Sequence, residues 1–375
     1  MSSKLFQILA VFIFVTVLAW PASAQKACFT SEAREQAERT AKVYQEPDSD
    51  YDPVLGYSTS KGARAGAPAI DDSGRALPIV CQANKKANEG SGTTPKFYCS
   101  VAGVVDADGD AVRYKIKPHF KGQSPEKRNG EVYGEFLSSR FSKALGFFAD
   151  DEWVANVTCA DCEKSLNKPF QGTPYAAFQP AAGIELPLGN GIDENCDGKD
   201  AAPLAASLEK LLKSGTPRAE IDAFKLWLAF IDHGDTKTDN HKFSCLDSEK
   251  TGNSRICKPG QAVFYVSDMG STFGFSSASE NKARLATWKK KEPLKIENGR
   301  CEANAKSVGD TKISEAGRAL LAGNLQKLLD AEASNELITR VFRASRNEER
   351  DQPAEAWSAE FQRKAKTIIN ARCSN

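Results

Sequence analysis

Apolar side chains recur every three to four residues over several stretches of this chain, which is the spacing that one face of a helix requires. Such a stripe predicts a helix over 132–145, and Gly146 directly after it can end that helix. A strongly apolar run predicts another helix over 218–231. The same spacing predicts further helices over 205–213, 313–329, 336–344 and 356–369.

Shorter apolar stretches bounded by turn-forming residues predict the strands. These stretches lie over 96–105, 111–117, 153–159 and 263–266. Residues 45–75 and 160–202 are rich in Pro, Gly and small polar residues and predict an irregular chain. The order is strands, one helix, a strand and then mostly helices. It indicates an α+β fold with a small β-rich lobe and a larger helical lobe.

An apolar run over 5–20 lies near the start of the chain. It follows one basic residue, Lys4, and precedes Ala22-Ser23-Ala24, a pattern typical of a signal peptide over 1–24. A retained membrane anchor is the alternative, but the run is short for a spanning helix. We therefore expect a mature chain from Gln25 that is extracytoplasmic, either periplasmic or secreted, and that has no membrane span.

Charge argues against two classes of partner. The chain has 50 Lys and Arg residues and 49 Asp and Glu residues, and loss of Lys4 with the signal peptide would balance the two signs. A balanced chain argues against a nucleic-acid partner and against a polybasic membrane contact. The pattern does not indicate an oligomeric state.

All ten cysteines follow the expected signal peptide. An even number of cysteines in an exported chain predicts disulfide bonds. For Cys159 and Cys162 a structural role is favoured over zinc binding or redox exchange. The pairs that positions along the chain suggest are Cys245 with Cys257, Cys81 with Cys99, and Cys28 with Cys373.

Three polar residues with characteristic spacing are candidates for chemistry. Asp235 and Asn240 follow the predicted helix over 218–231, and Asp268 follows a short apolar strand and precedes Met269-Gly270. In-line phosphoryl transfer uses a carboxylate beside the attacking hydroxyl and oxygen ligands for Mg²⁺ in this order. The alternative is a set of solvated turns, in which Asp and Asn are common.

A lysine at the end of a strand is the next candidate. Lys117 closes the predicted strand over 111–117, and Glu135 on the following helix could hold its ammonium group in place. Glu131 lies on the same side of that helix and is the substitute for Glu135. Lys115 points the same way as Lys117, because side chains alternate along a strand. The alternative is a pair of solvated lysines on an edge strand.

These motifs together resemble an atypical kinase fold. The order is Lys117-Pro118, then Glu135 to Gly146, then His233 to Asn240, then Asp268 to Gly274. It is similar to the branch that contains HipA, phosphatidylinositol kinases and secreted kinases, and it most resembles uncharacterised exported bacterial proteins of the same plan. The resemblance covers roughly residues 95–370.

The resemblance implies a two-lobed, protein-kinase-like fold held by disulfides. The N-lobe would span about 95–165 and the C-lobe about 166–375, after an N-terminal extension over 25–94. ATP with Mg²⁺ or Mn²⁺ would be the cofactor, and the acceptor substrate is not indicated. The implied roles are phosphate contact for Lys117, orientation of that lysine for Glu135, catalysis for Asp235, charge compensation for Lys237, and Mg²⁺ binding for Asn240 and Asp268.

One departure from the kinase pattern keeps two alternatives open. The first predicted hairpin carries Asp106, Asp108 and Asp110 where a kinase has a glycine-rich phosphate loop. An acidic turn is a poor cradle for phosphates. The chain could therefore be an active phosphotransferase or a pseudokinase that acts as a secreted binding or regulatory module.

A second motif predicts a calcium loop. Asp193, Asn195 and Asp197 occupy the first three ligand positions of such a loop, and Gly198 allows its sharp turn. Position twelve is Leu204 where an EF-hand has a bidentate Glu. The alternative for this stretch is a disulfide-anchored polar loop. If the loop does bind Ca²⁺, a Ca²⁺-stabilised, disulfide-rich structural protein is a third possible function of the chain.

Overall fold

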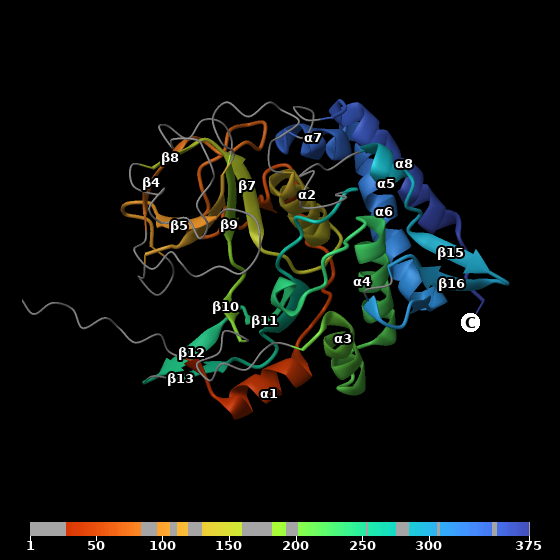
Figure 1. Ribbon diagram of the computed structural model, residues 1–375, viewed down its shortest axis with the longest axis horizontal. Coiled ribbons are helices and arrows are strands. Elements are labelled where there is room, and N and C mark those ends of the chain that lie inside the picture. Colours follow the sequence, from red (N-terminus) through yellow and green to blue (C-terminus); the bar gives the residue numbers. More distant parts are fainter. Residues whose placement is uncertain are drawn as a thin grey trace, which may run out of the picture.

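A six-stranded sheet and a set of helices form most of this mixed α+β protein (Figure 1). The computed structural model describes residues 28–83, 96–105, 111–118, 130–159, 182–192, 202–252, 254–274, 285–305, 308–346 and 351–374. In Figure 1 the sheet lies on one side of helix α2 (Glu131–Ala144), and the long C-terminal helices lie on the other.

The six-stranded sheet has the order β7-β9-β6-β5-β4-β8. Its pairs are antiparallel except for β4 with β8. Residues before position 94, expected to form an extension, contribute β4. The strands are β4 (Ile79–Ala83), β5 (Phe97–Ser100), β6 (Tyr114–Lys117), β7 (Asp151–Ala155), β8 (Val157–Cys159) and β9 (Ala182–Leu186).

The two faces of this sheet differ in chemistry. Phe97, Ile116, Trp153 and Ile184 belong to an apolar cluster on one face. Because side chains alternate along a strand, their charged neighbours, such as Lys117, lie on the other face, toward α2. The sheet therefore presents a buried polar surface to the rest of the molecule.

The remaining strands form small sheets. The chain passes from β9 through 187–189 into the sheet β10-β11-β14, so the two sheets are directly connected. These three strands are β10 (Asn190–Gly191), β11 (His241–Cys245) and β14 (Ala262–Val266). The others are β1 (Cys28–Phe29), β2 (Tyr51–Asp52), β3 (Tyr57–Ser58), β12 (Ser248–Thr251), β13 (Ser254–Cys257), β15 (Leu294–Glu297), β16 (Arg300–Ala303) and β17 (Lys312–Ile313).

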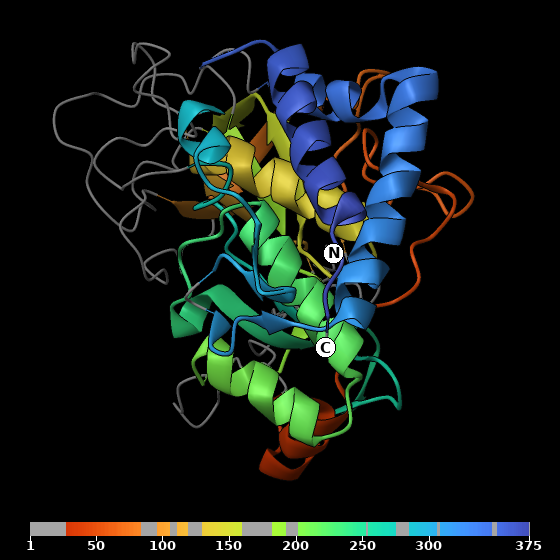
Figure 2. The same cartoon turned by 90° about the vertical axis from the view of Figure 1, so that its right-hand side faces the viewer.

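The helices predicted from apolar spacing are confirmed, although their ends shift by a few residues. Helix α4 packs on α6, and α6 packs on α8 (Figure 2). Ser314 caps the start of α6 by accepting a hydrogen bond from the Gly317 N–H at 3.2 Å. Besides α2, the helices are α1 (Ser31–Thr40), α3 (Leu204–Lys213), α4 (Arg218–Phe230), α5 (Leu285–Lys289), α6 (Glu315–Asn335), α7 (Leu337–Ala344) and α8 (Ala354–Asn370). Among the described residues, no helix has the length and apolar character needed to cross a membrane.

Two expectations of irregular structure are wrong in part. The β2–β3 hairpin lies within 45–75, and β9 and β10 lie within 160–202. Strand β9 was hidden because it contains Gly183 and Glu185, which are unusual in a strand. Glu185 is buried because Lys115 on β6 neutralises it.

Disulfide bonds join Cys81 to Cys99, Cys245 to Cys257, and Cys301 to Cys373. The first two pairings are confirmed. The pairing of Cys28 with Cys373 is wrong, because Cys28 lies on β1 beside β13, whereas Cys373 lies beside β16, where the Ser374 N–H donates to the Gly299 oxygen at 2.7 Å.

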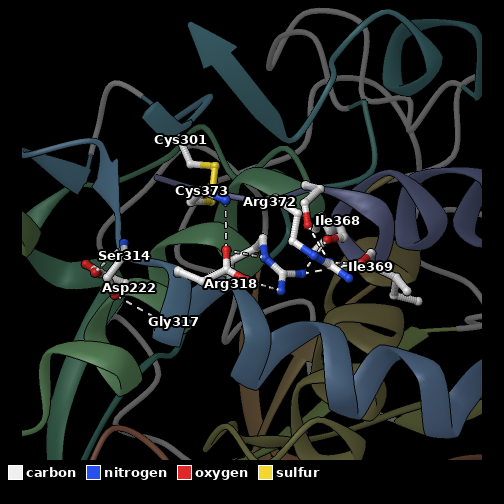
Figure 3. The surroundings of a disulfide bond; sticks show 11 residues. Asp222, Cys301, Ser314, Gly317, Arg318, Ile368, Ile369, Arg372 and Cys373 are labelled. Carbon is white, nitrogen blue, oxygen red and sulfur yellow. Dashed lines mark hydrogen bonds and ion pairs between the residues drawn. A yellow bond between two sulfur atoms is a disulfide. The ribbon is translucent and has the colours of Figure 1, made fainter. Parts of the chain in front are cut away.

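A buried arginine holds the Cys301–Cys373 region together (Figure 3). The Arg318 guanidinium donates to both carboxylate oxygens of Glu315, at 2.6 and 2.9 Å, and to the Ile368 oxygen near the end of α8 at 2.9 Å. Glu315 also accepts the Cys373 N–H at 2.8 Å. The end of α8 is thus fixed to the start of α6 by charged hydrogen bonds, and the disulfide ties the residues after α8 to β16.

Candidate functional site

Lys117 lies at the end of β6 with a side chain that is only 3% exposed. Its ammonium group forms an ion pair with Glu135 on α2. Glu131 Oε2 and Asp268 Oδ1 each lie 3.4 Å from the same nitrogen. The structure therefore brings the lysine together with both candidate glutamates and with the aspartate that follows β14.

The carboxylates keep Lys117 charged although it is buried. Burial alone would lower the pKa of this ammonium group, but Asp268, Glu135 and Glu131 together raise it well above its ordinary value. For Asp268, burial would raise the pKa, and Lys117 and Lys115 more than offset that effect. The pKa of Asp268 is therefore below its usual range, and a side chain that is 28% exposed remains ionised.

A second layer of charge lies behind Lys117 and was missed in the sequence. Lys115 forms an ion pair with Glu185, its partner residue on β9, and Glu185 is opposite Glu152 on β7. Single oxygens of Glu135, Glu152 and Glu185 all lie within 4.8 Å of one another. The signal available in the sequence was a glutamate next to apolar strand residues, Glu152 before Trp153-Val154 and Glu185 between Ile184 and Leu186.

Asp235 and Lys237 lie on the loop that follows α4. The backbone reverses at Asp232, which has a φ of 54°. The Lys237 ammonium group lies 2.9 Å from Asp235 Oδ2, and the Asp235 side chain is 28% exposed. The Asn240 side chain donates through Nδ2 to the Asp235 main-chain oxygen at 3.0 Å, which fixes the shape of this loop.

Backbone hydrogen bonds join the Asp235 loop to the Asp268 loop. The Asn240 oxygen accepts the N–H groups of Ser267 at 2.8 Å and Asp268 at 3.3 Å. The Gly234 N–H donates to the Ser271 oxygen at 3.2 Å. Asp235, Asn240 and Asp268 thus lie on two loops that are held to each other, although they are far apart in the sequence.

Helix α2 approaches the Asp268 loop too closely for side chains at two positions. A Cβ at Gly134 would lie 2.8 Å from the Gly270 oxygen and 2.9 Å from Thr272 Oγ1. A Cβ at Gly270 would lie 2.7 Å from the Cβ of Glu131. The two glycines let Glu131 and Glu135 reach Lys117 and Asp268.

His233 is buried beside both aspartates. Burial lowers its pKa to about 4, so the ring is neutral at pH 7. Neither ring nitrogen has a hydrogen-bond partner among the residues that the structure describes. His233 therefore contributes bulk and a potential donor, but no charge, beneath Asp235 and Asp268.

Asn240 and Asp268 are a chemically suitable pair for Mg²⁺. The metal prefers hard oxygen ligands, and Asp268 offers an ionised carboxylate. Asn240 uses Nδ2 for its own loop, so its amide oxygen is the atom that could bind a metal. The predicted calcium ligands Asp193, Asn195 and Asp197 lie outside the described residues, as do Asp106, Asp108 and Asp110.

Comparisons with known proteins show only distant structural similarity. No protein-family model and no curated protein matches the chain. The crystal structure of the proinflammatory kinase CtkA from Helicobacter pylori is similar with a TM-score of 0.39 and 8% identity. The similarity covers 79% of this chain and 95% of that chain.

Proposed function

We propose that this chain is an exported protein with a two-lobed, kinase-like fold that binds ATP with Mg²⁺ or Mn²⁺ and transfers a phosphoryl group to an acceptor. The main support is the position of Lys117. It is buried, is paired with Glu135, and lies beside Asp268 on a loop that is bonded to the Asp235–Asn240 loop. Burying a charged lysine has a desolvation cost that an apolar residue at this position would avoid, so a functional role for Lys117 is favoured.

Each residue has a defined part in this proposal. Lys117 binds nucleotide phosphate oxygens, and Glu135 keeps its ammonium group in position. The metal, held by Asn240 and Asp268, would neutralise charge on the phosphates. Asp235 orients the acceptor hydroxyl and accepts its proton, while Lys237 compensates charge beside it.

The disulfide bonds support the export that the N-terminal sequence predicts. Bonds such as Cys245–Cys257 persist in oxidising compartments and are rare in a reducing cytoplasm. The cleavage near Ala24 belongs to the same proposal. N-terminal sequencing of the protein recovered from its native host would test that site.

Thermal unfolding of residues 25–375 with ATP and either Mg²⁺ or Mn²⁺ tests the nucleotide site. A ligand that binds only the folded state stabilises it by about 2.7 kcal/mol at 100 times its Kd. We expect a metal-dependent rise in Tm that Asp268→Ala abolishes. Asp247→Ala, at an exposed aspartate that pairs only with Lys258 in the described chain, should keep the full rise. No rise at millimolar ATP would reject the proposal.

A pseudokinase is the second candidate, and the acidic turn at Asp106, Asp108 and Asp110 favours it. Asp235→Asn separates the two functions. If the protein is an active enzyme, this change should lower phosphoryl transfer by roughly 10²–10⁴-fold and leave the ATP-dependent rise in Tm intact. If the wild-type chain binds ATP but forms no ADP above background in the presence of candidate acceptors, the protein is a pseudokinase.

A further inference from the structure

Glu152 is a buried carboxyl group that the proposed function does not use. It lies on β7, is 3% exposed, and is close to Glu135 on α2 and Glu185 on β9. Its Oε1 atom is buried and has no hydrogen-bond partner within the described part of the chain. Arg140 on α2 donates to the main-chain oxygen of Glu152 at 2.9 Å.

The two lysines nearest Glu152 are already paired with other carboxylates, and Arg140 binds its main-chain oxygen rather than its carboxyl group. Lys117 is paired with Glu135, and Lys115 is paired with Glu185. Lys117 is also shared with Glu131 and Asp268. An ionised Glu152 would add a negative charge within 4.8 Å of two other carboxylates. An uncompensated charge at this depth costs several kcal/mol, so carboxyl groups in such a position take up a proton.

We propose that Glu152 is a neutral carboxylic acid at physiological pH and that it positions the two lysine–glutamate pairs by donating a hydrogen bond to a neighbouring carboxylate. The proton removes the excess negative charge. It also converts Glu152 from an acceptor without a donor into a donor beside two acceptors. The claim that Glu152 positions Lys117 for a ligand rests on the proposed function. The claim that Glu152 is neutral does not depend on that function.

The electrostatics of the surrounding elements support this assignment. Burial raises the pKa of Glu152, and the carboxylates of Glu135 and Glu185 raise it further. The ammonium groups of Lys115 and Lys117 on β6 act in the opposite direction but do not overcome these effects. The result is a pKa well above the ordinary value for glutamate.

A divalent cation is the competing explanation for three carboxylates at this spacing. Two of them are already in contact with ammonium groups. A cation placed among them would be repelled by Lys115 and Lys117, which makes a proton the better occupant.

Infrared spectroscopy of the full-length mature chain detects the proton directly. At pH 7 the carbonyl band of a protonated carboxylic acid should be present, and part of it should be missing in Glu152→Gln. Glu302→Gln, at an exposed position on β16, should leave the band unchanged. Equal bands in Glu152→Gln and in the wild type would overturn the proposal.

Chemical unfolding between pH 5 and pH 8 gives the second readout. A carboxyl group with a raised pKa in the folded state stabilises the fold at low pH, and this stability is lost as pH rises toward the folded pKa. Glutamine cannot ionise, so Glu152→Gln escapes the loss. Over this range the unfolding equilibrium constant of the wild type should rise at least tenfold relative to Glu152→Gln, since each pKa unit is a factor of ten. Profiles that stay parallel within about twofold contradict the proposal.

Two further outcomes are decisive. If Glu152→Gln does not fold, Glu152→Met replaces it in the same comparison, because burial also raises the pKa of Glu135 to about 8 and a wild-type band could come from either group. The absence of any protonated-acid band in the wild type at pH 7 overturns the proposal directly. If Mn²⁺ without nucleotide removes the band and stabilises the wild type but not Glu152→Gln, the cluster is a metal site and the proposal fails. A band without any ATP-dependent Tm rise would reject only the proposed function.

Discussion

Charge compensation decides which side chains can be buried on the inner face of the six-stranded sheet. Lys117 and Glu135 are each 2% exposed, and neither could remain ionised there alone. Lys115, two residues before Lys117 on β6, forms a second buried ion pair with Glu185 on β9. Each buried charge is therefore tolerated only while its partner is present.

Replacement of Lys117 tests this dependence. Lys117→Met leaves Glu135 and Asp268 without their shared cation, so we expect it to lower the free energy of unfolding by about 3–5 kcal/mol at pH 7. Lys61→Met, at an exposed lysine whose side chain is 75% exposed, should have little effect. Denaturant unfolding measures both.

The same variant should respond to pH in a defined direction. Asp268 has a lowered pKa in the folded state, so it contributes stability above its ordinary pKa of 3.8, and this stability is lost as pH falls below it. Lys117→Met removes that contribution. The gap between wild type and variant should therefore be smaller at about pH 2.5 than at pH 7. If the difference in the free energy of unfolding between wild type and Lys117→Met does not change with pH, then Lys117 does not lower the pKa of Asp268.

At the scale of elements, hydrophobic spacing predicted α2, α3, α4, α6, α7 and α8, but it missed α1, α5 and part of the sheet. Helices α2, α4 and α8 bury an apolar face or are buried all round, and that pattern is local in the sequence. Strand β9 could not be predicted in this way, because Glu185 is buried only through a lysine on another strand. The pairing of β1 with β13 is likewise a contact between distant parts of the chain.

The candidate site shows the same division. Lys117, Glu135, Asp235, Asn240 and Asp268 were found because short motifs carry them. The supporting residues Glu152 and Glu185 have no motif, and only the register of β6, β9 and β7 brings them together. The sequence thus indicates the candidate site residues, and the fold is needed to find the groups that hold them.

The contact between α2 and the Asp268 loop can be tested with matched glycines. Gly134→Ala would place a Cβ against the Gly270 oxygen and Thr272, so we expect a loss of about 1–3 kcal/mol in the free energy of unfolding. Gly323→Ala on α6 meets nothing within 4 Å and should instead stabilise the protein by about 0.5–1 kcal/mol. If both variants gain stability, α2 can move away from the loop.

At the scale of the whole molecule, disulfides and buried charges act on different parts. Cys81–Cys99 joins neighbouring strands of the six-stranded sheet. Cys245–Cys257 closes the end of β11, and Cys301–Cys373 ties the last described residues to β16. The ion pairs of Lys117 connect the sheet, α2 and the Asp268 loop between these covalent links.

Removal of individual disulfides should rank by the length of chain that they enclose. Cys301 and Cys373 are 72 residues apart, and Cys245 and Cys257 are 12 apart. Loop-closure entropy predicts losses of about 4 and about 3 kcal/mol when each pair is changed to alanine. Calorimetry of the two double variants measures the difference. A larger loss for Cys245 and Cys257 would mean that packing, not chain entropy, dominates.

The disulfides also bear on how the chain can be made. Cys81–Cys99, Cys245–Cys257 and Cys301–Cys373 each join two cysteines with no other cysteine between them in the sequence. If the chain enters an oxidising compartment with its N-terminus first, each of Cys81, Cys245 and Cys301 finds its partner in the next cysteine to emerge. Cys28 emerges before Cys81, so a wrong bond from Cys28 is the one that would require reshuffling, which is among the slow steps of oxidative folding.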